Sequence, residues 1–370
     1  MTSLSDAAFA LEPRYLDLLR TLVELESPTL GKPYVDALVT FLEAHLGERG
    51  WRVQRHPRES VGDVLVATKT GGVGARTLLL THCDTVWPVG TLASMPFRHE
   101  GDEVYGPGVL DMKAGVTTAV EAVALAESSA GLRGPVTLLV TTDEELGSRF
   151  SHELIETLAA QHDRVFVLEP GTEGGALKIG RKGVGDFSVS FAGRSAHAGN
   201  HPELGASALR EFAHFLLFAE LLNDAEAGTS VNVTVAMGGS VGNVIAERAT
   251  AHVDFRALTE AEAVRVEHAL RGYTPQDERV QVTVTGGLNR PPLEPTDKNL
   301  ALFEAAKEVQ PGLTGAVVGG GSDGNFTSAL GVPTLDGLGS VGEGPHARHE
   351  HISVRQTLGR VALLAALLSK

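Results

Sequence analysis

The sequence predicts an α/β fold interrupted by an inserted α+β domain, and three observations support this. The chain has 370 residues, whereas a single hydrophobic core stops growing at about 250–300 residues, so two domains are expected. From residue 77 onward, short β-rich runs alternate with helical patterns, as in βαβ units around a largely parallel sheet. Between residues 182 and 290 the order becomes strand, helix, strand, strand, helix, strand, which is typical of ferredoxin-like domains.

The N-terminal region predicts an amphipathic helix, because Leu16, Leu19, Leu22 and Val23 recur at helical spacing. It has no basic cluster followed by an apolar run, so it is not expected to be a signal peptide. No stretch of the chain approaches the ~18 consecutive apolar residues of a membrane span. Cys83 is the only cysteine, so intrachain disulfides are impossible and a reducing compartment is expected. We therefore expect a cytoplasmic protein with no membrane partner.

Three buried strands are predicted in the first half of the chain, and polar or acidic residues follow each of them directly. The runs 77–80, 136–141 and 165–168 precede the letters HCD, DEE and EP. In open α/β sheets, ligands bind at the carboxyl ends of the strands. These histidines and acids are therefore placed where a ligand site is expected.

The inserted domain is predicted at residues 182–290, which divides the first domain into residues 1–181 and 291–370. Strands are expected at 186–191, 231–236, 249–256 and 280–285, with helices at 206–222 and 260–270. Such a unit forms one sheet with both helices on one face. After residue 290 the alternation of strands and helices resumes to the C-terminus, so the C-terminal segment is assigned to the first domain.

The charge of the chain argues against a nucleic-acid partner. The formal net charge is -15, which repels polyanions. The basic residues are spread along the sequence and do not form the stripe that phosphate contacts require. Nucleic acid is therefore not expected as a partner.

His82 and Asp84 lie two residues apart at the end of a predicted strand, so their side chains point to the same side. A carboxylate beside a histidine is typical of a metal ligand with a partner that fixes its tautomer. A capped turn histidine is an equally good interpretation of this motif alone. Cys83 faces the opposite way and cannot share a proton with His82, which argues against a cysteine nucleophile.

Further carboxylates follow the same pattern. Asp111 comes after a Gly/Pro-rich turn and before the helical run 114–125, where it could simply cap the helix. Asp143, Glu144 and Glu145 end an apolar strand, and three adjacent carboxylates repel one another unless a cation or solvent screens them. Glu169 closes the next strand in the same manner. A metal site is favoured over a solvated loop.

The segment GEGPHARHEHISV offers three further histidines, His346, His349 and His351, and spacing does not choose among them. Carboxylates and imidazoles without thiolates favour zinc, with cobalt and manganese as the alternatives. The HExxH and GxxxxGK[ST] motifs are absent. The glycine-rich run that starts at Gly319 lacks the βαβ context of a dinucleotide site, so a substrate loop is the better interpretation and an oxidoreductase is disfavoured.

Together these motifs resemble the co-catalytic zinc exopeptidases, the family of glutamate carboxypeptidase, acetylornithine deacetylase and aminoacylase, and the bacterial glutamate carboxypeptidases in particular. The resemblance covers nearly the whole chain and implies a zinc-exopeptidase-like mixed sheet with helices on both faces. It is densest in five segments, which occur in the family's order: THCDTVWPVGTLASMPF, EGDEVYGPGVLDMKAG, TTDEELGS, GRSAHAGNHPELGASAL and GGGSDGNF. The segment RKG at 181–183 departs from the glutamate-specific branch and is more similar to the broader amidase group.

The resemblance implies two metal sites that share one carboxylate. Asp111 would bridge two zinc ions. The remaining ligands would be His82 and Glu169 at one ion and Glu145 and His346 at the other. His346 is selected because the family's last ligand lies four residues before an acid, here Glu350, and six before a β-branched residue.

The family also implies the catalytic groups. Glu144 would be the general base, and Asp84 would orient His82. The peptide bond after Asp111 is often cis in such enzymes. The activity implied is metal-dependent hydrolysis of an amide or peptide bond next to a free C-terminal carboxylate, with glutamate as the expected product.

The inserted domain resembles the family's lid and dimerisation domain, which implies a homodimer. His197 would stabilise the oxyanion. Asn243 and Arg256 would contact the substrate, and Arg256 would bind the substrate's free carboxylate. Arg290 and Gly321 are further candidate substrate contacts. The structural alternatives are turn positions for His197 and Asn243 and an ion pair with Asp254 for Arg256.

Three competing functions remain at this point. An N-acyl-amino-acid deacylase or a dipeptidase would use the same metals and base, and no motif isolates the pocket that distinguishes them. A non-catalytic binding protein on the same scaffold would be expected to lack the base or a ligand. The base Glu144 and all five metal ligands implied by the resemblance are present in this sequence, which favours an enzyme.

Overall fold

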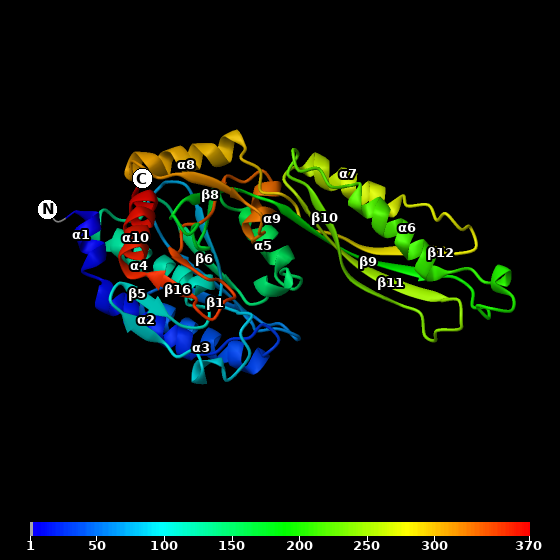
Figure 1. The fold of residues 1–370 in the computed structure, drawn as a ribbon. Coiled ribbons are helices and arrows are strands. Elements are labelled where there is room, and N and C mark those ends of the chain that lie inside the picture. The colour runs from blue at the N-terminus through cyan, green and yellow to red at the C-terminus, as the bar shows by residue number, and fades with distance from the viewer. Residues whose placement is uncertain (1–2) are drawn as a thin grey trace. The chain divides into compact units, whose positions relative to one another are not determined.

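The chain forms two compact units (Figure 1). The structure is a computed structural model and describes residues 3–370. The first unit comprises the chain up to Ile179 together with Pro295–Val317 and Ser322–Lys370, and the second comprises Gly180–Glu294 and Val318–Gly321. No helix among the described residues is both long and apolar enough to span a membrane.

The first unit is built on a six-stranded mixed sheet in the order β1-β2-β6-β3-β7-β14. Its strands are β1 (Arg52–His56), β2 (Val64–Lys69), β3 (Thr77–His82), β6 (Val136–Thr141), β7 (Arg164–Val167) and β14 (Thr334–Leu335). The central strand β3 runs parallel to both β6 and β7, and β14 runs parallel to β7. The β2 strand is antiparallel to β1 and β6. The three strands predicted from the sequence are therefore neighbours whose carboxyl ends share one edge.

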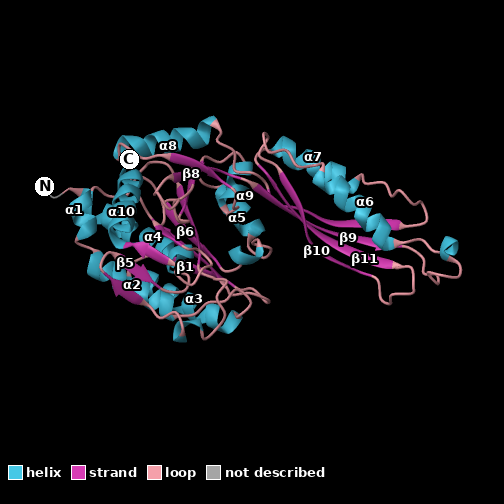
Figure 2. Ribbon diagram, in the orientation of Figure 1, coloured by secondary structure: helices cyan, strands magenta, loops and turns pink. Residues whose placement is uncertain are grey.

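Helices cover both faces of this sheet, as predicted (Figure 2). Along β3, Leu79 packs into the larger core, whereas Leu78 and Leu80 pack into the smaller one, because successive strand residues point to opposite faces. The larger core contains residues of α1 (Leu4–Phe9), α2 (Glu12–Glu24), α3 (Lys32–Glu48), α4 (Ala114–Ser129), α8 (Asp297–Val309) and α10 (Val354–Ser369). The smaller core contains residues of α5 (His152–Ala159) and α9 (Gly324–Ala329). The predicted N-terminal amphipathic helix is α2, which buries Leu19, Leu22 and Val23.

Two small sheets complete the first unit. One has the order β15-β16-β5-β4, and the other pairs β13 with β8, whose last residues belong to the second unit. Their strands are β4 (Arg98–Glu100), β5 (Glu103–Tyr105), β8 (Leu177–Arg181), β13 (Gly315–Val318), β15 (Gly342–Glu343) and β16 (His351–Ser353). The pairing of β16 with β5 joins the C-terminal histidine segment to the chain that leads into Asp111, two regions about 240 residues apart.

The second unit has the strand and helix order of a ferredoxin-like domain. Its elements are β9 (Gly183–Ala192), α6 (Ala208–Glu220), β10 (Ser230–Gly238), β11 (Arg248–Ala257), α7 (Glu260–Arg271) and β12 (Gln281–Arg290). The sheet order is β10-β11-β9-β12, and all its pairs are antiparallel. On β9, Phe187 and Phe191 are buried in one core together with residues of α6 and α7. Both helices therefore lie on the same face of the sheet (Figure 1).

Candidate metal centre

The parallel register of the first unit aligns the strand ends that carry the candidate ligands. Leu80 on β3 pairs with Val167 on β7. His82 and Glu169 each lie two residues further on, so they reach the same edge of the sheet. Their Nε2 and Oε1 atoms are 3.5 Å apart.

The first group of candidate ligands consists of His82, Asp111 and Glu169, whose ligand atoms all lie within 4.8 Å of one another. His82 Nε2 is 3.2 Å from Asp111 Oδ1. His82 Nδ1 lies 3.1 Å from the carbonyl oxygen of Asp84. Because a carbonyl can only accept, Nδ1 carries a proton. Nε2 is therefore the ring nitrogen that faces the two carboxylates and that would bind a metal ion.

The second group consists of Asp111, Glu145 and His346, with ligand atoms within the same distance. His346 Nε2 is 3.4 Å from Asp111 Oδ2 and 3.3 Å from Glu145 Oε2. Asp111 therefore presents Oδ1 to one group and Oδ2 to the other. A carboxylate that faces two ligand groups with its two oxygens has the geometry of a bridge between two cations.

The donor set fits divalent cations. Glu145 Oε1 is buried, and no hydrogen-bond donor contacts it in the described part of the chain, so this oxygen lacks the compensation that a buried carboxylate needs. Hydrogen bonds to Asp111 and Glu145 raise the pKa of His346 to about 10. Burial opposes the ionisation of Asp111, yet hydrogen bonds from His346 and His82 hold the pKa of its carboxyl well below the usual range. The cluster thus attracts positive charge, and imidazole and carboxylate ligands suit zinc or a similar ion.

The carboxylate of Asp84 contacts residues of both ligand groups. It is fully buried and lies 3.3 Å from His82 Nδ1. Its two oxygens also accept from the backbone N–H groups of Glu144 and Glu145, both at 3.3 Å, and from Thr29 Oγ1 at 2.8 Å. One carboxylate therefore positions a ligand histidine and the turn that carries the candidate base and its neighbouring ligand.

Glu144 belongs to the short 3-10 turn Glu144–Leu146, which begins after β6 and two intervening residues. Its side chain belongs to neither ligand group. The residue is 9% exposed, so it is largely removed from bulk water. A carboxylate beside a metal ligand, but not itself in the ligand set, is placed as a general base requires.

Glu350 is a site residue whose contacts were not predicted from the sequence. In the sequence, Glu350 served only to select His346 among the three C-terminal histidines. Its buried carboxylate accepts from Trp87 Nε1 at 2.8 Å and from the backbone N–H groups of Gly108 and Leu110, both at 2.9 Å. It also accepts from the N–H of Asp111 at 3.1 Å. Burial raises its pKa to about 7. Glu350 therefore holds the loop that presents Asp111.

The two other C-terminal histidines do not belong to either ligand group. His351 packs against Tyr105, with 5.1 Å between ring centroids. His349 lies close to Gly344, where a Cβ would come within 2.8 Å of its ring. His346 has a positive φ of 60°, an uncommon conformation for a residue with a Cβ. The peptide bond from Asp111 to Met112 is cis.

The other predicted site residues belong to the second unit. His197 is exposed, and its Nδ1 accepts from the backbone N–H groups of Gly199 and Asn200, both at 3.1 Å. In its neutral form the imidazole therefore carries its proton on Nε2. Asn243 lies beside this loop, since its carbonyl accepts from the N–H of Ala198 at 2.9 Å.

The candidate substrate arginines have defined surroundings in the same unit. Arg256 donates from Nε and Nη2 to the carboxylate of Asp254, at 3.0 and 2.8 Å, which is the ion pair named as the structural alternative. Arg290 is 7% exposed at the end of β12. A Cβ on Gly321 would lie 3.2 Å from Arg290 Cδ, so these two residues are neighbours.

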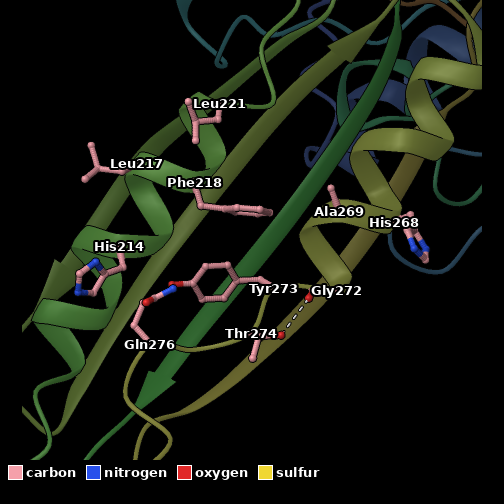
Figure 3. Close-up of a pocket in the computed structure, with 10 residues that line it drawn as sticks. All are labelled: His214, Leu217, Phe218, Leu221, His268, Ala269, Gly272, Tyr273, Thr274 and Gln276. Carbon is pink, nitrogen blue, oxygen red and sulfur yellow. Dashed lines mark hydrogen bonds between the residues drawn. The ribbon is translucent and has the colours of Figure 1, made fainter.

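A separate cavity of about 570 Å³ lies between α6 and α7 of the second unit (Figure 3). Its lining includes two histidines, but neither belongs to a candidate metal-ligand group in residues 3–370. None of the predicted site residues lines it. The lining residues are His214, Leu217, Phe218, Leu221, His268, Ala269, Gly272, Tyr273, Thr274 and Gln276.

Comparison with known proteins identifies the family to which the chain is similar. The family model described as "Peptidase family M20/M25/M40" matches residues 78–370. The chain is 32% identical to Carboxypeptidase G2 of Pseudomonas sp. (strain RS-16), over 99% of this chain and 91% of the relative. It is also 32% identical to a succinyl-diaminopimelate desuccinylase of Gluconobacter oxydans, over 74% of this chain and 75% of that protein.

Solved structures show the same fold. Aminopeptidase PepT from Bacillus cereus superposes with a TM-score of 0.76 at 21% identity, covering 97% of this chain and 98% of that one. The M20 family metallo-carboxypeptidase Sso-CP2 from Sulfolobus solfataricus gives a TM-score of 0.75 at 18% identity, covering 96% and 98%.

Proposed function

Because this chain belongs to peptidase family M20/M25/M40 and is a metallopeptidase of that family, we propose that it is a dizinc carboxypeptidase that releases a C-terminal amino acid, chiefly glutamate. The observation that carries the proposal is the two-sided position of Asp111 between two groups of imidazole and carboxylate ligands. The preference for glutamate rests on the likeness to Carboxypeptidase G2 over nearly the whole chain.

Two zinc ions would be held by the residues of the two ligand groups, with cobalt or manganese as substitutes. His82, Asp111 and Glu169 would hold one ion, and Asp111, Glu145 and His346 the other. When bound, such a pair of ions supplies Lewis acidity to the scissile carbonyl and to the attacking water. Asp84 contacts His82 at Nδ1, which would leave Nε2 to bind the ion.

Glu144 would move the proton. It takes a proton from the water that attacks the scissile carbonyl and passes it to the leaving amine nitrogen. The backbone hydrogen bond from Glu144 to Asp84 supports this assignment, because it fixes the start of the turn on which the base lies.

His197 would stabilise the negative oxygen of the tetrahedral intermediate, in its own subunit or in a partner subunit. Nδ1 accepts hydrogen bonds from two backbone N–H groups. The neutral ring therefore carries its proton on Nε2, and this N–H is the donor to the substrate. A donor that is already fixed in orientation costs no reorganisation when charge develops on the substrate.

The substrate carboxylate would be bound by arginine. Asp254 occupies Nε and one N–H of Nη2 of Arg256, so the Nη1 edge of the guanidinium faces away from this acid. That edge can still bind a carboxylate through two parallel hydrogen bonds. Asn243, Arg290 and Gly321 would form further contacts with the substrate.

We further propose a homodimer formed through the second unit. Strand β10 is an edge strand, and its Val235 and Met237 are 55% and 70% exposed. An exposed apolar edge is a template for pairing with another copy of the same strand. Sedimentation velocity is expected to show a dimer that Met237→Lys dissociates and that Thr283→Lys, on the opposite edge β12, leaves intact. If the wild-type protein is a monomer, the homodimer proposal is wrong.

A cytoplasmic location, expected from the single cysteine, is also part of the proposal.

The substrate proposal is tested with the zinc-loaded protein and a panel of N-acyl amino acids and dipeptides that differ only at the C-terminal residue. Release of glutamate above all other residues, abolished by a chelator, is expected. Equal release of many residues would exclude a glutamate carboxypeptidase, and no metal-dependent release would leave only a binding protein.

A deacylase is the second candidate function, and the desuccinylase relative is the observation that favours it. N-succinyl and N-acetyl amino acids distinguish it from a carboxypeptidase when the amino acid is kept constant. Faster turnover of these small acyl groups than of peptides or aromatic acyl groups would identify a deacylase. Turnover that requires a free α-amine would identify a dipeptidase.

A further inference from the structure

Arg360 is a buried cation in α10 of the first unit that takes no part in the metal centre. The residue is 3% exposed. Burial alone lowers the pKa of its guanidinium to about 10, with no contribution from a nearby charge. No acidic side chain among residues 3–370 forms an ion pair with it. Buried charges are normally paired, because removing them from water is costly.

The hydrogen bonds of Arg360 leave most of its donors without a protein partner. Nη2 donates to the backbone carbonyl of Gly175. Nε is buried and has no partner in the described part of the chain. A guanidinium has five N–H donors in a fixed planar fork, and a neutral carbonyl compensates only one of them. The environment of Arg360 is therefore incomplete without a further acceptor.

A small cavity lies against this guanidinium. It measures about 200 Å³, and Arg360, Gln356, Thr314, Gly175 and Gly312 are among its lining residues. Gly175 and Gly312 have positive φ values of 75° and 95°, a conformation that favours glycine. A Cβ on Gly175 would lie 3.4 Å from Gln356 Oε1 and 3.9 Å from Arg360 Nη2, so glycine keeps this space open beside two polar side chains.

We propose that this cavity binds a small oxyanion, a carboxylate or a phosphate, on the guanidinium of Arg360. The planar fork matches two oxygens of such a group, and the pairing removes the uncompensated charge. Gln356, one helical turn before Arg360 on α10, lines the same cavity, and its side-chain amide carries N–H donors. The volume suits a single small anion and excludes a peptide. None of the lining residues is a candidate metal ligand, so this site is distinct from the metal centre and does not depend on the proposed substrate.

The decisive experiment is equilibrium dialysis of zinc-loaded protein against labelled inorganic phosphate, and in a second arm against labelled acetate, at constant ionic strength. Wild-type protein is expected to bind one equivalent more of one of these anions than Arg360→Met. The difference between the two proteins excludes any anion bound at the zinc ions, because both proteins have the same zinc ligands. A difference with phosphate alone identifies a phosphate site, and a difference with acetate alone identifies a carboxylate site.

The Tm with and without the anion provides a second test. Arg360→Met removes a buried charge and keeps an unbranched apolar stem, so it should fold and should lack the anion-dependent rise in Tm that is expected for wild-type protein. Gln356→Leu, at the exposed rim, should weaken anion binding several-fold and serves if Arg360→Met does not fold. The proposal would be overturned if wild-type protein and Arg360→Met bind both anions equally, which would leave water as the occupant of the cavity. If Arg360→Met does not fold, equal binding by wild-type protein and Gln356→Leu would overturn it in the same way.

Discussion

The carboxylate of Glu350 accepts a hydrogen bond from the backbone N–H of Asp111, with 3.1 Å between the two atoms. The same carboxylate binds the N–H groups of Gly108 and Leu110. It therefore fixes three backbone positions in the loop that ends at the carboxylate shared by both ligand groups. Glu350 belongs to neither ligand group, yet it fixes the backbone that presents the two carboxylate oxygens of Asp111.

Glu350→Gln is expected to weaken metal binding about 10–100-fold, as loss of a group that orients a metal ligand does. The amide places an NH₂ group against backbone N–H donors, so at least one of these hydrogen bonds is lost. Zinc affinity, measured by competition with a chromophoric chelator, is the readout. Glu343→Gln, an exposed acid on β15 of the same region, is the matched control. Unchanged affinity in Glu350→Gln would show that the loop holds Asp111 without it.

Glu144→Gln is expected to lower kcat by about 10²–10⁴, the usual contribution of a general base. Zinc content and fold should be unchanged, because Glu144 lies outside both ligand groups. Glu153→Gln, an exposed acid in the first turn of α5, should behave like wild-type protein. Activity of Glu144→Gln within a few-fold of wild-type would remove this residue as the base.

His197→Ala should lower kcat by about 10²–10³, the effect of removing one oxyanion donor, with little change in KM. His201→Ala removes an exposed histidine four residues away that pairs with Glu203 and should leave kcat unaltered. Steady-state kinetics of the two variants separates catalysis from loop structure. If both variants are equally impaired, His197 acts only on the loop.

Asp63 should make stability depend on pH at the acid end. Burial alone would raise its pKa, but hydrogen bonds from Lys32, the backbone of Arg58 and Arg55 lower it from 3.8 to about 2. The folded pKa lies below the unfolded one, so this stabilisation is complete above pH 3.8 and is lost as the pH falls through about 2.

Asp63→Asn is therefore expected to reduce the free energy of unfolding by about 1 kcal/mol at pH 6, after allowance for solvent screening, and by progressively less below pH 4. Urea unfolding at several pH values measures this. Asp163→Asn, which breaks an exposed pair with Arg76, should have a smaller effect at every pH. A loss for Asp63→Asn that stays constant down to pH 2.5 would refute this linkage.

The sequence predicted the positions of the candidate metal ligands where local geometry decides them. His82 and Asp84 share a face because strand residues alternate, and the 3.3 Å contact between them follows from this rule. Glu145 follows β6 and Glu169 follows β7, the two strands that flank β3 and run parallel to it, so their position at one edge of the sheet could be expected from βαβ order alone. The spacing of the three C-terminal histidines did not distinguish them, and only the resemblance selected His346, which the structure brings to Asp111 and Glu145.

Features that depend on distant parts of the chain could not be predicted in this way. The role of Glu350 requires the pairing of β16 with β5, which brings together residues 239 positions apart. Arg360 is one of several polar residues of α10, and its lack of an acidic partner appears only when this helix is packed. The pair between Arg256 and Asp254 was foreseen only as an alternative, because strand residues two apart can always reach each other.

The most direct test of the metal centre is stepwise zinc titration of chelator-stripped protein, with zinc binding and glutamate release from an N-acyl-glutamate followed together. We expect two zinc ions per wild-type chain, with hydrolysis returning as the sites fill. Glu169→Gln and Glu145→Gln should each weaken one site, and Asp111→Asn should weaken both. A single zinc equivalent in wild-type protein, or hydrolysis that persists after complete removal of zinc, would contradict a two-metal centre bridged by Asp111.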